Sequence, residues 1–181
     1  QPHFFFNTLN NLYALSLESS YKVPDVIIKL SKLMEYVLYD IEGTKYVSLI
    51  KEIDYIQNYI EIEKLRFENV EVTLNIESNI DNVIVPPLLF ISLIENAFKH
   101  GGYNNKKLKI KINCKIVDKF FYLEIINNFV LSPSVKNQKG IGLVNTKKRL
   151  KLIYKNNFSI EHQVKFNYYI IQLKIPINNE D

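Results

Sequence analysis

The stretch from residue 86 to residue 101, PPLLFISLIENAFKHG, decides the fold of this chain. Pro86 and Pro87 suit the first turn of a helix, where a backbone N–H has no partner within the helix. An apolar run then carries the helix to about His100, where two consecutive glycines end it. The stretch therefore predicts a mostly buried helix with a few polar residues near its end.

Those polar residues are candidates for a binding site. Asn96, Lys99 and His100 are three or four residues apart and can share one face of the helix, and Glu95 precedes them. An amide oxygen is a hard ligand that suits Mg²⁺ bound to nucleotide phosphates. By spacing alone, the group fits such a site and the solvent-facing side of an amphipathic helix about equally well.

Glycine is scarce, with five in 181 residues, so its placement is informative. Gly140 and Gly142 lead into a helix predicted from about Ile141 to Tyr154. Free N–H groups at a helix N-terminus can bind phosphate, although a plain loop-to-helix turn also explains a single GxG. Arg149, in the same helix, can face a phosphate or pair with a carboxylate.

The start of the chain, PHFFFNTLN, contains another candidate. An unprotonated imidazole nitrogen of His3 can accept a phosphoryl group near neutral pH, whereas a single histidine at the edge of a helix is more often structural. Apolar spacing predicts one helix over residues 4–15 and a second from Pro24 to Gly43. These helices form a hairpin that pairs with a second copy or rests on the remaining chain.

The remaining pattern is mixed. A helix is predicted over residues 48–65, with Ser48 as its N-cap, and the polar residues 128–139 are predicted to form a loop. Alternating apolar and polar residues predict strands near residues 70–77, 107–116, 121–125, 158–163 and 168–175. The fold class is therefore α+β, with a helical unit over 1–43 and an α+β unit over 44–181.

Composition excludes several classes of protein. The 12 Tyr and 11 Phe supply too much apolar surface for a disordered chain, and no apolar run approaches the ~18 residues of a membrane span. The single Cys114 excludes a disulfide framework and a multi-thiolate zinc site, and it favours a reducing compartment. The net charge of +4 comes from dispersed lysines, which indicates a solvated basic surface and no direct contact with nucleic acid.

Five motifs in order resemble the bacterial sensor histidine kinases of the LytS/YehU type. They are PHFFFNTLNNL, KLSKLMEYVLYD, IQNYIEIEKLRF, VPPLLFISLIENAFKHG and GIGLVNTKKRLKLIY. The resemblance covers nearly the whole chain. It implies a dimerising helical hairpin that carries the phospho-acceptor, followed by a Bergerat-type ATP-binding domain, which is a helix–sheet sandwich.

The resemblance also implies roles for single residues. His3 matches the phospho-accepting histidine, and Asn96 matches the asparagine of the N-box, the helix motif that holds Mg²⁺ and phosphate. Residues 128–139 match the loop that closes over ATP. The other implied ATP-binding positions are Glu95, Lys99, His100, Gly101, Asn127, Gly140, Gly142, Leu143, Asn145 and Arg149.

Three positions depart from the pattern of the family. Asn127 stands where the wider superfamily has an aspartate that accepts the adenine amino group, and Phe129 stands where a glycine follows it. Loss of a charge-assisted hydrogen bond costs about 1 kcal/mol, so weak ATP binding is expected. Many histidine kinases place an acid directly after the phospho-histidine, whereas this chain has Phe4.

The expected function is that of a kinase core in a two-component system, using ATP and Mg²⁺. The implied partners are a second copy, bound through the hairpin, and a response regulator of the LytTR type. Because the chain starts with Gln1, we expect a cytoplasmic piece of a longer protein anchored in the bacterial inner membrane by an upstream sensor segment. One alternative is a degenerate nucleotide-binding scaffold. A hydrolytic machine is disfavoured because Ser92 stands where that class places a catalytic glutamate.

Overall fold

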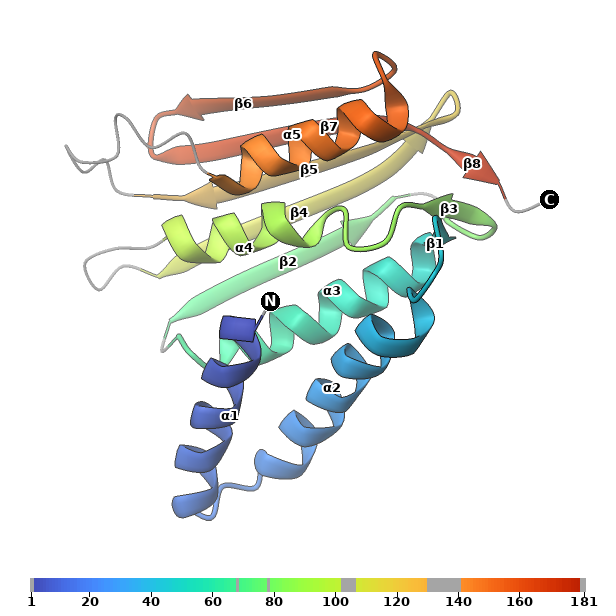
Figure 1. Ribbon diagram of the computed structural model, residues 1–181. Coiled ribbons are helices and arrows are strands. Elements are labelled where there is room, and N and C mark those ends of the chain that lie inside the picture. Colours follow the sequence, from blue (N-terminus) through green and yellow to red (C-terminus); the bar gives the residue numbers. More distant parts are fainter. Residues whose placement is uncertain (1, 68, 78, 102–106, 130–140, 180–181) are drawn as a thin grey trace.

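A five-stranded sheet forms the centre of the chain, and helices cover one face of it (Figure 1). The computed structural model describes residues 2–67, 69–77, 79–101, 107–129 and 141–179. The strand order is β2-β4-β5-β7-β6, and β2 and β4 are parallel while the other neighbours are antiparallel. The strands are β2 (Val70–Ile76), β4 (Leu108–Val117), β5 (Phe120–Asn128), β6 (Ser159–Lys165) and β7 (Tyr168–Pro176).

The alternation of residues in β4 explains how the sheet faces the core. Ile110 and Ile112 are buried, whereas Lys109 and Lys111 between them are exposed. Successive side chains of a strand point to opposite faces of the sheet, so the apolar set of β4 lies under the helices. The predicted α+β class is confirmed.

Three helices pack on this face of the sheet. They are α3 (Leu49–Lys64), α4 (Ile91–His100) and α5 (Ile141–Tyr154). The Ser48 side chain accepts a hydrogen bond from Ile50 N at 3.3 Å, as its prediction as an N-cap requires. The prediction that α4 begins at the two prolines was wrong. The helix begins at Ile91, because Leu88 has a φ of +53° and so cannot continue a right-handed helix.

A second, small sheet was not predicted. It joins β1 (Val47–Ser48), β3 (Val83–Val85) and β8 (Asn178–Asn179) in the order β1-β3-β8. Its strands of two or three residues are too short to show a period in the sequence. The sheet holds the segment before α3 beside the segment that leads toward α4.

The first two helices form the predicted hairpin. They are α1 (Pro2–Leu17) and α2 (Val23–Glu35), and a π-helix, η1 (Tyr36–Asp40), extends α2. Leu30, Leu33 and Tyr36 join the same buried cluster as residues of α3, so the hairpin rests on the remaining chain. No helix in the described part of the chain has the length and apolar character to cross a membrane.

Candidate functional site

Two motifs that lie far apart in the sequence meet between α4 and α5. Asn96, which is half-buried on α4, lies against Gly142 in the first turn of α5. A Cβ atom on Gly142 would lie 2.7 Å from Asn96 Nδ2 and 3.1 Å from Asn96 Oδ1. Only glycine allows so close an approach without a shift of the neighbours. The structure therefore brings Asn96 of α4 and Gly142 of α5 to one place.

Hydroxyl groups fasten the two helices beside this contact. Ser92 Oγ and Thr146 Oγ1 are 2.7 Å apart, and Thr146 Oγ1 donates a hydrogen bond to Gly142 O at 2.9 Å. The Thr146 side chain is buried, so both bonds are shielded from water. Ser92 thus links the helices at the position where a hydrolytic enzyme would place its glutamate.

Arg149 connects α5 to the segment in front of α4. Its Nη1 donates to Leu88 O at 3.0 Å, and its Nη2 donates to Pro87 O at 2.5 Å. The sequence left open a phosphate or a carboxylate as partner, and the guanidinium instead binds two main-chain carbonyl groups. A role of Arg149 toward nucleotide stays a prediction.

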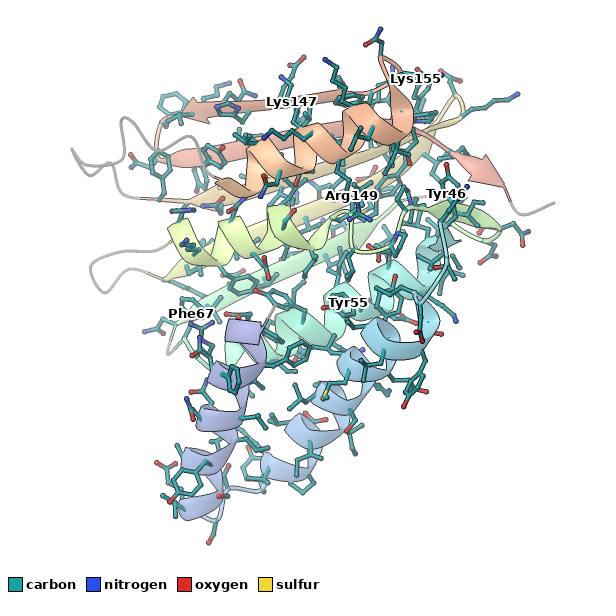
Figure 2. All side chains as sticks on the ribbon, viewed as in Figure 1. Tyr46, Tyr55, Phe67, Lys147, Arg149 and Lys155 are labelled. Carbon is teal, nitrogen blue, oxygen red and sulfur yellow. The ribbon has the colours of Figure 1, made fainter. Side chains whose placement is uncertain are left out.

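A cavity of about 380 Å³ opens between α3, α4, α5 and the start of α1. Glu95, Gly142 and Arg149 line it from α4 and α5, and Tyr55 lines it from α3. In Figure 2, Arg149 lies between α5 and α4, and Tyr55 lies between α3 and α4. Phe5 lines the same cavity from α1, only two residues after His3. Asn145 is a further lining residue and is exposed.

Asn127 lies at the end of β5 beside the end of α4. Its side chain is 1% exposed, and its Nδ2 donates to Asn128 O at 3.2 Å. A Cβ atom on Gly101 would lie 3.4 Å from this Nδ2 and only 2.2 Å from Leu108 Cδ1, so only glycine fits there. The implied adenine position is therefore well buried and already engaged in a local hydrogen bond.

The other predicted positions are scattered around this centre. Lys99 and His100 are exposed in the last turn of α4. The pKa of His100 is lowered, mainly because neighbouring atoms remove part of its hydration and secondly because the positive charge of Lys99 is close. Leu143 is half-buried and packs against the core from α5. His3 lies in the first turn of α1.

The loop predicted over residues 128–139 falls mostly outside the described residues, as does Gly140. Its first residue was assigned wrongly, because Asn128 pairs with Tyr168 as the last residue of β5. The backbone N–H of Phe129 still donates to Asn167 O at 2.9 Å. The sheet thus extends to the point where the departure from the family pattern occurs.

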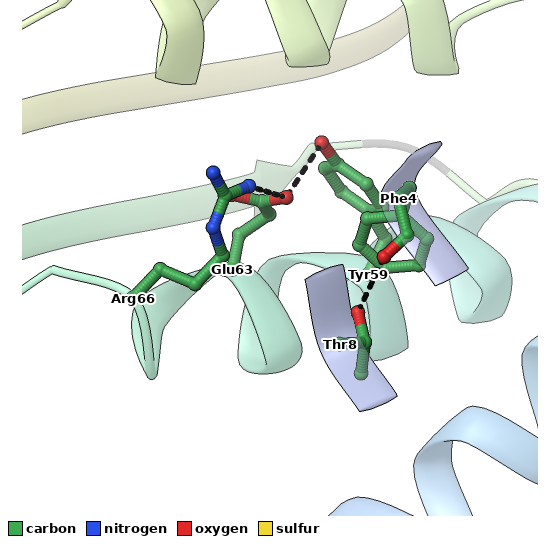
Figure 3. Close-up of polar contacts among 5 residues, drawn as sticks. All are labelled: Phe4, Thr8, Tyr59, Glu63 and Arg66. Atoms are coloured by element: carbon green, nitrogen blue, oxygen red, sulfur yellow. Dashed lines mark hydrogen bonds and ion pairs between the residues drawn. The ribbon is translucent and has the colours of Figure 1, made fainter. Parts of the chain in front are cut away.

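A buried acid on α3 escaped the sequence analysis. Glu63 is 2% exposed, and both of its carboxylate oxygens accept from Arg66 Nη1, at 2.8 and 2.9 Å. Tyr59 Oη donates to Glu63 at 3.2 Å, and the ring of Phe4 packs on Tyr59 with centroids 4.8 Å apart (Figure 3). Thr8 Oγ1 donates to Phe4 O one turn away. This cluster holds the start of α1 on α3.

Glu52 is the second buried acid that was missed. The apolar stripe of α3 contains Ile56 and Ile60, and Glu52 and Glu63 lie one turn before and after them on the same stripe. That position was the available signal, because an acid on an apolar stripe is expected to be buried with a partner.

Comparison with known proteins agrees with these observations. A sequence profile described as "Histidine kinase" matches residues 1–70. "Sensor histidine kinase/phosphatase LytS" of Staphylococcus aureus (strain MRSA252) is 34% identical over 109 residues, which are 59% of this chain and 18% of that protein. "Sensor histidine kinase BtsS" of Escherichia coli (strain K12) is 28% identical over 182 residues, which are 99% of this chain and 32% of that protein. The chain thus spans less than a third of either relative.

Solved structures share the fold. The catalytic domain of histidine kinase ThkA has a TM-score of 0.56 at 21% identity, covering 75% of this chain and 97% of that domain. The histidine kinase domain of the blue-light activated kinase EL346 from Erythrobacter litoralis has a TM-score of 0.56 at 12% identity, covering 97% and 96%. Profile, relatives and fold together confirm that this chain resembles the sensor histidine kinases of the LytS type.

Proposed function

We propose that this chain is the kinase core of a two-component sensor. It binds ATP with Mg²⁺, transfers the γ-phosphoryl group to His3, and passes it on to an aspartate of a response regulator. The observation that carries the proposal is the contact between Asn96 and Gly142, beside a cavity that Phe5 of α1 also lines. This contact and this cavity support a site in which α4 and α5 hold the metal and the phosphates and α1 supplies the acceptor.

Phosphoryl transfer depends mainly on the positioning of the reacting groups and on stabilisation of the developing charge by the protein. An imidazole nitrogen of His3 forms a bond to the γ-phosphorus, the bond from that phosphorus to the bridging oxygen breaks, and ADP leaves with the bonding pair. No group of three His, Cys, Asp or Glu side chains in the described residues converges as a metal site. Mg²⁺ would therefore bind Asn96, phosphate oxygens and water, which suits its preference for oxygen ligands.

A homodimer through the hairpin is part of the proposal. Apolar side chains remain exposed along one face of α1, and several more remain exposed on α2 and η1. They are Phe6, Leu9, Tyr13, Leu17, Ile27, Ile28, Met34 and Leu38. An apolar stripe of this size on a helical pair is typical of a surface that another copy covers.

The partners and location of the full protein are further proposals. A solved neighbour is titled as histidine kinase ThkA in complex with response regulator protein TrrA, with a TM-score of 0.51 at 16% identity. The complex supports a response regulator as the partner of this chain, and the LytTR type follows from the resemblance alone. The relatives are named sensors, so we place this region on the cytoplasmic side of a bacterial inner membrane, below a membrane-anchored sensor segment.

One observation favours a second candidate, a dimeric scaffold that binds nucleotide without phosphotransfer. Asn127 brings no charge to the adenine position, and its amide already donates to Asn128 O. Phe129 removes the backbone freedom that a glycine would give there. Weak binding without labelling of a histidine would identify this alternative.

The first prediction tests the binding site. Asn96→Ala removes the proposed metal ligand, and we expect titration calorimetry with Mg·ATP to show at least a tenfold loss of affinity. Asn156→Ala, in the exposed turn after α5, is the matched control and should bind like the wild type. Equal affinity of the wild type and Asn96→Ala would refute the proposed site.

A further inference from the structure

Glu52 joins two segments that lie far apart in the sequence. Its side chain is 0% exposed. Tyr36 Oη, at the start of η1, donates a hydrogen bond to Glu52 Oε1, and Leu88 N donates to the same oxygen at 2.5 Å. One carboxylate oxygen therefore bridges the end of the helical hairpin and the segment in front of α4.

The segment that Glu52 holds has a strained backbone. Leu88 has a φ of +53°, a conformation that costs a bulky residue about 1 kcal/mol or more and persists when the surroundings fix it. The backbone N–H of Leu88 donates a hydrogen bond to Glu52. The backbone carbonyl oxygen of Leu88 accepts a hydrogen bond from Arg149 Nη1 at 3.0 Å. The conformation of Leu88 therefore depends on groups from α3 and α5.

The electrostatic state of these groups is consistent with a fixed link. Burial raises the pKa of the Glu52 carboxyl, while the hydrogen bonds from Tyr36 and from the Leu88 amide, and the charge of Arg149, oppose that shift. Burial, and then the proximity of Glu52, raises the pKa of Tyr36, so its hydroxyl keeps its proton and remains a donor. A buried acid is a weak source of stability compared with an apolar residue of its size.

We propose that Glu52 is a positioning residue that makes the start of α4 follow the end of the helical hairpin. The link runs from Tyr36 through Glu52 to Leu88. Arg149 extends it to α5, the helix that begins with Gly142 in its first turn.

The meaning of this link for signalling rests on the proposed function. If Asn96 binds Mg·ATP, a movement of the hairpin that withdraws the Tyr36 hydroxyl would release Leu88 and shift α4 against α5. Nucleotide binding would then report the state of the hairpin. The mechanical link itself can be tested without nucleotide.

The second prediction uses amide hydrogen exchange, read by mass spectrometry on the whole chain. Tyr36→Phe removes the hydroxyl and keeps the ring, which packs on Tyr55 with centroids 4.9 Å apart. We expect peptides covering residues 86–91 to exchange about tenfold faster than in the wild type, with no change in β5 and β7. Tyr39→Phe, the same change at an exposed position of η1, should leave residues 86–91 unaffected.

A second pair of variants separates positioning from packing. Glu52→Gln keeps an acceptor for Leu88 N and should retain most of the protection, whereas Glu52→Met removes it and should lose protection over residues 86–91. Faster exchange confined to α2 and η1, or an equal effect of Tyr39→Phe, would overturn the proposal. Titration of the same proteins with Mg·ATP keeps the two ideas apart. Absence of binding by the wild type contradicts the proposed function, while the exchange data still decide the link.

Discussion

At the scale of single residues, the burial of Glu52 predicts how the stability of the fold depends on pH. Burial raises the pKa of its carboxyl above the ordinary 4.5, so the folded state keeps a proton that the unfolded state loses. The contribution of the protonated Glu52 carboxyl to the free energy of unfolding is therefore full below pH 4.5. It falls as the pH rises toward the pKa that this carboxyl has in the folded state. Glu52→Gln has no such proton, and we expect its stability relative to wild type to improve over this range. The gain is about 1.4 kcal/mol for each pH unit that separates the pKa of the folded state from that of the unfolded state.

Urea unfolding of both proteins, followed at intervals from pH 4 to pH 8, measures this difference. All other titrating groups are common to the two chains, so they cancel in the comparison. Free energies of unfolding that run parallel throughout would show that folding leaves the pKa of this carboxyl unchanged.

The sequence predicted part of the site at this scale. The resemblance implied that Asn96 and Gly142 belong to one site. The structure brings the two residues into contact, and their role toward nucleotide stays a prediction. It did not predict the partners of Arg149, because the carbonyl groups of Pro87 and Leu88 carry no signature in the sequence. Glu52 escaped because a glutamate on a helix is most often solvated.

At the scale of elements, strongly periodic segments were predicted well. Strands β4 and β5 follow from alternation, and α3 follows from its N-cap and apolar stripe. The start of α4 was misplaced because two prolines normally suit a first turn. In the structure, a hydrogen bond from Leu88 N to Glu52 and one from Arg149 to Leu88 O fix Leu88 in a left-handed conformation there. A tertiary contact of this kind cannot be read from local sequence.

At this scale we predict that the exposed apolar face of α1 forms the dimer contact. Tyr13→Glu combined with Leu17→Glu places charges on side chains that are 66% and 69% exposed, so the fold of one copy should tolerate them. Burial of such an apolar side chain contributes about 1.5–3 kcal/mol, and the double variant should weaken a dimer at least a hundredfold. Sedimentation equilibrium measures this. Phe166→Glu is the control, because Phe166 is also exposed but lies in the turn between β6 and β7. If the dimer keeps its affinity in the double variant, the exposed face of α1 is not the dimer contact.

At the scale of the whole molecule, the hairpin is held on α3 at both of its ends. Phe4 packs on Tyr59 at the start of α1, and Tyr36 binds Glu52 at the end of the hairpin. The cavity of about 380 Å³ lies between the helices that these contacts join. A movement of the hairpin relative to α3 therefore requires at least one of these contacts to adjust, which suits the proposed role of the hairpin as carrier of the phospho-acceptor.

The last prediction follows from this arrangement and concerns which histidine is phosphorylated. His100 ends α4, and His162 is exposed on β6, where its ring lies 5.8 Å from that of Tyr169. Both lie on the part of the chain for which ATP binding is proposed, whereas His3 lies on the hairpin. In a protein extended upstream of Gln1 and supplied with radiolabelled ATP, we expect His3→Gln to lose the acid-labile label and His162→Gln to keep it. Phosphoryl transfer requires the attacking nitrogen within contact distance of the γ-phosphorus, and glutamine lacks that nitrogen. Full labelling of His3→Gln would therefore show that the acceptor is a residue other than His3.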